Sequence, residues 1–181
     1  MVNTFEGLLA LLVASDVAFI LVGGVAVCLN GFVRTTEDLD ILVEDSGPNI
    51  ERLLECLRQF GQGHAAELTT DDFTDEEGAI RVQEDFDLDI FVRMRGRKYA
   101  DLLGRLAFHE MADGTKIPYL NAEGLIILKQ GSVREKDRID VAALSAGRIS
   151  HQPADLGTGG TSLDSLRPAP GEDDPGQSIR P

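Results

Sequence analysis

An apolar run over residues 8–29 constrains the fold of this chain more than any other sequence feature. The run is broken at Ser15-Asp16 and again at Gly23-Gly24, and the first basic residue of the chain is Arg34. A membrane span needs about 20 unbroken apolar residues, and a signal peptide needs basic residues ahead of its apolar stretch. We therefore expect no membrane span. Three elements are predicted instead: a helix at 3–14, a buried strand at 17–22 and a short helix at 25–30.

The rest of the chain continues this mixture of helices and strands. Alternating apolar residues predict strands at 38–43, 79–83 and 86–92, and a hairpin that turns at Asp113-Gly114. Helical spacing predicts helices at 47–60, after Asn121 and at 134–146. The predicted fold class is α/β (α+β), one domain over residues 1–150 with a mixed central sheet flanked by helices and with helices at its C-terminal end.

Charge limits the partners that this chain can have. The net charge is −14, so bulk electrostatics do not favour nucleic acid. A local basic segment, Arg93 to Lys98, is expected to be a solvated strand end and loop. Residues 151–181 are rich in Pro, Gly, Ser and Asp and are predicted to form a disordered acidic tail. The only two cysteines lack disulfide or metal spacing, which fits a cytoplasmic protein.

Two short motifs lie on either side of the short helix at 25–30. Gly23-Gly24 follows a buried strand, and glycines there let backbone N–H groups approach a phosphate. Asp38 and Asp40 are two residues apart on a strand, so both carboxylates lie on one face. Such a pair repels unless a cation is shared, and Mg²⁺ prefers these oxygen ligands. Taken alone, each motif is more often a plain turn or a strand edge.

A third carboxylate is expected from the strand at 86–92. Asp89 is the first candidate, and Asp87, on the same face, is the alternative. With Asp38 and Asp40, it would form a cluster able to hold two divalent ions. Arg34 and Thr36 precede the pair, where they can bind phosphate or the carboxylates.

The order Gly-Gly, short helix, Gly, Arg-x-Thr-x-Asp-Leu-Asp resembles the signature of the DNA polymerase beta-like nucleotidyltransferase superfamily. The variant is similar to the minimal bacterial type, including members of toxin–antitoxin and abortive-infection systems. The segment from Leu120 to Asp140 resembles their C-terminal helical stretch, and the resemblance covers about residues 5–147. It implies the nucleotidyltransferase fold.

The resemblance also implies roles for individual residues. Asp38, Asp40 and Asp89 would be the catalytic metal ligands for two Mg²⁺ ions, with Mn²⁺ as a substitute. The nucleotide triphosphate (NTP) would be bound by Gly23, Gly24, Arg34, Thr36, Lys129 and Arg134, supported by Lys136 and Asp137. Without the resemblance, Lys129 would be interpreted as a solvent-facing residue and Arg134 to Asp140 as a surface ladder of salt bridges.

The activity implied is transfer of a nucleoside monophosphate from NTP to a hydroxyl. The acceptor is open: a protein, an RNA end and a small molecule all fit, and a cognate toxin or antitoxin is a possible partner. The alternative is a catalytically weak nucleotide-binding or regulatory protein that acts by contact with a partner.

Overall fold

The computed structural model describes residues 4–150, and side chains as far as residue 147. The tail predicted at 151–181 lies outside the described residues. Within the described part, no helix has both the length and the apolar character that crossing a lipid bilayer requires.

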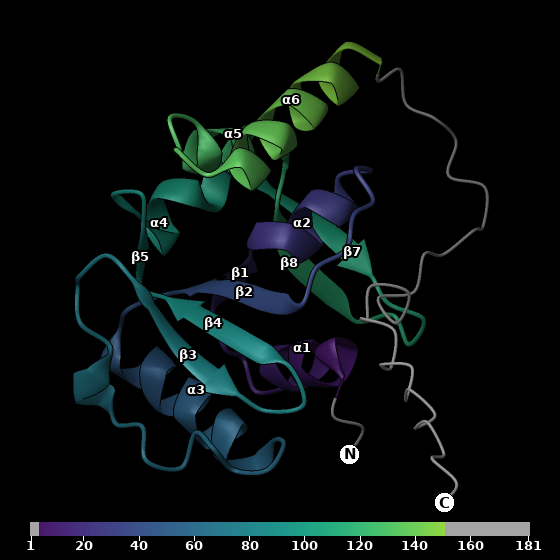
Figure 1. The fold of residues 1–181 in the computed structure, drawn as a ribbon. Coiled ribbons are helices and arrows are strands. Elements are labelled where there is room, and N and C mark those ends of the chain that lie inside the picture. The colour runs from purple at the N-terminus through teal and green to yellow at the C-terminus, as the bar shows by residue number, and fades with distance from the viewer. Residues whose placement is uncertain (1–3, 151–181) are drawn as a thin grey trace, which may run out of the picture.

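A six-stranded mixed sheet forms the centre of the molecule (Figure 1). Its strands run across the sheet in the order β3 (Ala79–Gln83), β4 (Asp87–Phe91), β2 (Asp38–Val43), β1 (Phe19–Leu21), β8 (Lys116–Leu120) and β7 (Leu106–Glu110). The pairs β2–β4 and β1–β8 are parallel, and the other three neighbouring pairs are antiparallel. The predicted mixed sheet is confirmed.

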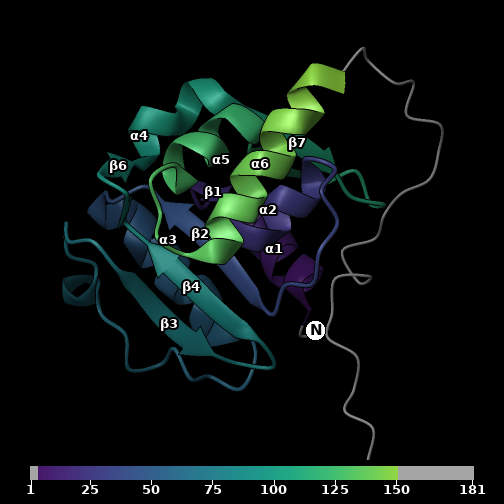
Figure 2. The same ribbon diagram turned by 45° about the horizontal axis from the view of Figure 1, so that its top comes forward.

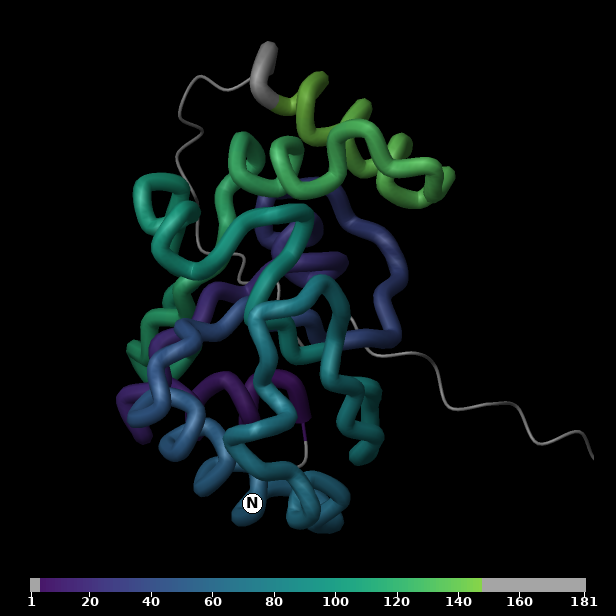
Figure 3. The backbone as a smooth tube through the Cα atoms, turned by 90° about the vertical axis from the view of Figure 1, so that its left-hand side faces the viewer, coloured from purple at the N-terminus to yellow at the C-terminus, as the bar shows by residue number. Residues whose placement is uncertain are grey.

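Helices cover both faces of this sheet (Figures 1 and 2). On one side lie α1 (Phe5–Ala14) and α3 (Gly47–Gln59); on the other lie α2 (Gly23–Leu29), α5 (Ala122–Lys129) and α6 (Glu135–Ser150). Figure 3 shows α5 and α6 together at the end of the molecule opposite α3. The helix predicted after Asn121 is α5, and the Asn121 side chain caps it by accepting a hydrogen bond from the Gly124 N–H at 3.0 Å.

The core explains the long apolar run. All three residues of β1 are buried, because the strand lies in the middle of the sheet with helices on both faces. One buried polar residue fixes the start of α3 against the sheet: Asn49, fully buried, donates to the carbonyls of Ala18 and Glu44 and accepts from the Ala18 N–H. These bonds pair backbone groups that β1 and β2 leave open at their ends.

The basic segment differs in part from its prediction. It forms a small hairpin of β5 (Arg93–Met94) and β6 (Arg97–Lys98), followed by a short helix α4 (Tyr99–Leu102) and a 3₁₀ turn at Leu103–Arg105. Lys98 Nζ lies 2.9 Å from Asp75 and 2.7 Å from Asp45. Strands of two residues are too short to show a period in the sequence, and the acidic partners come from distant loops. The exposed turn at residues 95–97 agrees with the predicted solvated strand end and loop, whereas the pairing of β5 with β6 and the ion pairs of Lys98 were not predicted.

Candidate active site

Strands β2 and β4 bring three carboxylates to one place. Asp40 of β2 and Asp89 of β4 are register partners in a parallel pair, so their side chains emerge on the same face from strands about 4.8 Å apart. Asp38 lies one pleat away on that face and pairs in register with Asp87. Asp89 is 7% exposed. Sequence alternation alone could not choose between Asp87 and Asp89, whereas this register places Asp89 beside Asp40.

The Gly23-Gly24 turn lies directly against this group. Gly23 has φ +63°, a left-handed conformation that favours glycine. The Gly24 N–H points at Oδ2 of Asp40 at 3.4 Å, and a β-carbon on Gly24 would overlap with the hydroxyl of Thr36. The glycines therefore let α2 begin in contact with Asp40.

Replacing Gly23 with alanine is expected to lower the free energy of unfolding by about 2–4 kcal/mol. The new β-carbon would be strained at positive φ and would also overlap with the Asp40 carboxylate. Gly131→Ala is the matched control, because Gly131 has φ +77° but open space around it. Urea unfolding should give a loss of only about 1–2 kcal/mol there. Equal losses in the two variants would contradict the contact between the turn and Asp40.

The surroundings of Asp40 disfavour its charged form. Burial, reinforced by the negative charge of Asp89, raises the pKa of Asp40 to about 6, and Asp38 acts in the same direction. The Gly24 N–H opposes this shift but does not cancel it. The carboxylates thus form a cluster with excess negative charge.

One cation already binds part of this cluster. Arg81, on β3 opposite Asp89, donates Nε–H to Oδ1 of Asp89 at 2.8 Å and Nη2–H to Oδ2 at 2.7 Å. A third bond runs from Nη1 to Asp87 at 3.1 Å. The hydrogen bonds and charge of Asp89 raise the pKa of Arg81 further above its ordinary value. Arg81 was not among the site residues predicted from the sequence. Its signal was the tight turn between β3 and β4, whose antiparallel pairing sets position 81 opposite position 89.

A second group of charges lies across from the carboxylates. The Asp140 carboxylate, fully buried, accepts two hydrogen bonds from Arg34 at 2.9 and 3.0 Å. Lys129 Nζ lies 2.9 Å from Asp140 and 2.9 Å from Asp137. The interpretation of Asp140 as part of a surface ladder is therefore wrong. Helix α6 places it beneath Arg34 and Lys129, where it orients both cations.

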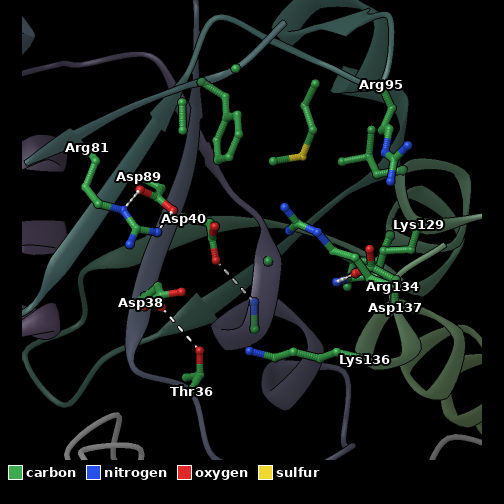
Figure 4. A pocket seen from close by; sticks show the side chains of 18 of the residues that line it. Thr36, Asp38, Asp40, Arg81, Asp89, Arg95, Lys129, Arg134, Lys136 and Asp137 are labelled. Carbon is green, nitrogen blue, oxygen red and sulfur yellow. Dashed lines mark hydrogen bonds and ion pairs between the residues drawn. The ribbon is translucent and has the colours of Figure 1, made fainter. Parts of the chain in front are cut away.

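Members of both groups line one cavity of about 640 Å³, a size typical of sites for small ligands, whereas the buried Asp140 does not line it. Figure 4 shows the carboxylates and Arg81 on one side and Lys129, Arg134, Lys136 and Asp137 on the other. The cavity brings together all nine predicted site residues: Gly23, Gly24, Arg34, Thr36, Asp38, Asp40, Asp89, Lys129 and Arg134. Asp87 does not line it. Residues not predicted also line it, and they include Arg81, Phe91, Met94 and Arg95.

The donor set fits a divalent cation in part. Within residues 4–147, no lysine or arginine forms an ion pair with Asp38 or Asp40, so this pair can accept a metal ion. Asp89 has both oxygens on Arg81. Accordingly, among the described residues, no three His, Cys, Asp or Glu side chains are arranged as a ready-made metal site. The carboxylates of Asp38 and Asp40 are therefore open to a metal ion, whereas Asp89 can bind one only if Arg81 moves away from it.

Comparison with known proteins gives a structural match without a sequence match. No family model and no curated protein matches the chain. The lincosamide antibiotic adenylyltransferase LnuA, solved with lincomycin bound, superposes with a TM-score of 0.53 over 80% of this chain and 99% of LnuA, at 17% identity. The chain has the nucleotidyltransferase fold. A Thermotoga maritima protein assigned as a nucleotidyltransferase gives a TM-score of 0.47 at 18% identity, over 80% of this chain and 83% of that protein.

Within the nucleotidyltransferase fold, the cavity lies over one face of the sheet. Its floor is formed by β2 and β4, and its opposite wall by the start of α2 together with residues of α5 and α6. The hairpin β5–β6 contributes Met94 and Arg95 to the rim. The strands, helices and loops that carry the predicted site residues therefore all border this one cavity.

Proposed function

We propose that the chain transfers a nucleoside monophosphate from an NTP to a hydroxyl acceptor, with a divalent ion bound at Asp38 and Asp40. The observation that supports this most is the placement of these two carboxylates and Asp89 in one cavity, beside the Gly23-Gly24 turn. Cations for the phosphates lie across the same cavity on Lys129 and Arg134.

The chemistry is an in-line displacement at phosphorus. The acceptor hydroxyl loses its proton to water and its oxygen forms a bond to the α-phosphorus, the bond from that phosphorus to the bridging oxygen breaks, and pyrophosphate leaves. Lys129 and Arg134 bind the phosphates, the backbone of Gly23 and Gly24 approaches them, and Asp89 orients the acceptor hydroxyl. Mg²⁺, or Mn²⁺ in its place, supplies charge neutralisation on the phosphates when bound.

We propose several classes of molecule as the acceptor. A protein side chain, an RNA end or a small molecule fits this chemistry, within or outside a toxin–antitoxin pair. The net charge of −14 weighs against RNA. A small molecule is supported by the apolar lining of the cavity near Phe91 and Met94 and by the lincomycin that LnuA binds.

Incubation with each of four α-labelled NTPs tests the proposal. The protein is mixed with total RNA, total protein or a small-molecule extract, once with Mg²⁺ and once with a chelator. We expect label in one acceptor fraction with Mg²⁺ only, and none with the Asp38→Asn, Asp40→Asn double variant, because that variant removes both open carboxylates. Label that persists with the chelator or in the double variant would contradict the assigned site.

One observation favours a second candidate function. Arg81 binds both oxygens of Asp89, which suits a protein that binds nucleotide without turnover and acts by contact with a partner. Calorimetry with NTP and Mg²⁺ distinguishes the two. Binding with no labelled product in any acceptor fraction would support this regulatory role.

A further inference from the structure

The ion pair between Arg81 and Asp89 has an unusual position for a structural contact. Arg81 lines the cavity, and its forked contact covers the two oxygens that a metal ion or an acceptor hydroxyl would need. Figure 4 shows the guanidinium beside Asp89, with Asp40 next to Asp89 on the side away from Arg81. The same guanidinium also reaches Asp87, so its single positive charge is shared between two carboxylates of β4.

We propose that Arg81 is the resting counter-ion of Asp89, and that it restricts divalent-ion binding in the free protein to Asp38 and Asp40. Arg81 gives Asp89 up when the nucleotide and its metal ion enter the cavity. Asp89 then becomes available as the third ligand and to the acceptor hydroxyl. This inference rests on the proposed function and adds a positioning residue to it.

The exposure of the pair makes such an exchange feasible. The Arg81 side chain is 49% exposed and that of Asp89 10%, so the guanidinium has a path to solvent whereas the carboxylate stays in place. Because about half of the Arg81 side chain stays in contact with water, its release from Asp89 exposes less uncompensated charge than the separation of a fully buried pair would. A divalent ion that also gains Asp38, Asp40 and phosphate oxygens can replace this guanidinium on Asp89.

The ion pair between Arg81 and Asp89 reduces repulsion among the carboxylates in the free protein. Asp38, Asp40 and Asp89 are close together on two neighbouring strands, and burial together with the charges of Asp89 and Asp38 disfavours the ionised form of Asp40. Without a metal ion, a third uncompensated carboxylate would add to this repulsion. Arg81 removes that cost without filling the space between Asp38 and Asp40.

Binding of Mn²⁺ to the full chain without nucleotide tests the proposal, by electron paramagnetic resonance of free Mn²⁺ or by calorimetry. We expect Arg81→Gln to bind Mn²⁺ about tenfold more tightly than the native chain, or to take up one additional ion, since one unit charge is removed next to the site. Arg58→Gln is the matched control. Arg58 is similarly exposed, at 45%, and pairs with Glu55 on α3, away from the cavity, so the net charge changes equally.

Two results of these binding measurements would contradict the proposals. Equal affinity and stoichiometry in Arg81→Gln, Arg58→Gln and the native chain would overturn the proposal for Arg81 alone, provided that the Asp38→Asn, Asp40→Asn variant loses binding. Mn²⁺ binding that is absent from every variant would overturn the proposed function as well. If Arg81→Gln does not fold by circular dichroism, Arg81→Met decides: it removes the same charge and the fork with an unbranched side chain, and a gain in affinity over the native chain supports the proposal, whereas no gain overturns it.

Discussion

Replacing Asp140 with alanine is expected to lower the free energy of unfolding by about 3–5 kcal/mol. Asp140 is fully buried and accepts hydrogen bonds from Arg34, with a further ion pair to Lys129 at 2.9 Å. Its removal leaves two mostly buried cations, 14% and 12% exposed, facing each other across an empty space. Lys129 retains Asp137, whereas among the described residues the Arg34 side chain retains only its hydrogen bond to the carbonyl of Thr35.

Urea unfolding measures the loss, and Glu135→Ala is the matched control. Glu135 lies on the same helix, is exposed, and its replacement changes the net charge by the same amount. A loss of about 0.3–1 kcal/mol is expected for that control, from its favourable place in the first helical turn. If Asp140→Ala lost no more than Glu135→Ala, α6 would not be fixed to the site through this carboxylate.

The network around Asp140 was only partly predictable from the sequence. Lys129 and Asp137 were expected near the site, but nothing in the spacing of α6 distinguishes the buried Asp140 from the exposed Glu135 or Arg138. Burial there depends on how α6 packs across α5 and onto the loop that carries Arg34, which is a long-range arrangement. A local sequence pattern can show which face of a helix is apolar and therefore buried. The sequence of α6 has no clear apolar face, so it does not indicate which residues are buried.

The carboxylate site was more predictable because its geometry is local. Strand alternation gives the common face of Asp38 and Asp40, and Gly23-Gly24 must follow the buried strand that precedes them. What the sequence leaves open is strand order. Asp89 lies beside Asp40 because β4 is parallel to β2 with that register, which is a tertiary arrangement. Arg81 reaches Asp89 through the local antiparallel pairing of β3 with β4, whose register the sequence pattern does not fix.

Replacing Asp40 with asparagine is expected to reduce nucleotidyl transfer by about 10³-fold or more. Asp40 lies at the centre of the candidate site: Asp38 is one pleat away, Asp89 is its register partner, and the Gly24 N–H points at its carboxylate. Asparagine keeps the shape but loses the charge that a divalent ion needs. Initial rates of label transfer at saturating NTP and Mg²⁺ measure the loss.

The same variant should be more stable than the native chain, which separates lost chemistry from lost folding. Burial and Asp89 raise the pKa of Asp40 to about 6, so ionised Asp40 destabilises the folded state at pH 7. In metal-free buffer at pH 7, Asp40→Asn should therefore gain about 1–3 kcal/mol in urea unfolding. The gain should shrink as the pH falls from about 6 towards 3.8, the ordinary value for Asp, because the native carboxyl is then protonated.

Asp87→Asn is the matched control for the loss of activity in Asp40→Asn. Asp87 carries the same group on the neighbouring strand, in register with Asp38, and it shares Arg81 with Asp89, yet it does not line the cavity. Its replacement should leave transfer within a few-fold of the native rate. If Asp87→Asn lost as much activity as Asp40→Asn, the third carboxylate would be Asp87 rather than Asp89. If neither variant lost activity, the transfer would take place without this cluster of carboxylates.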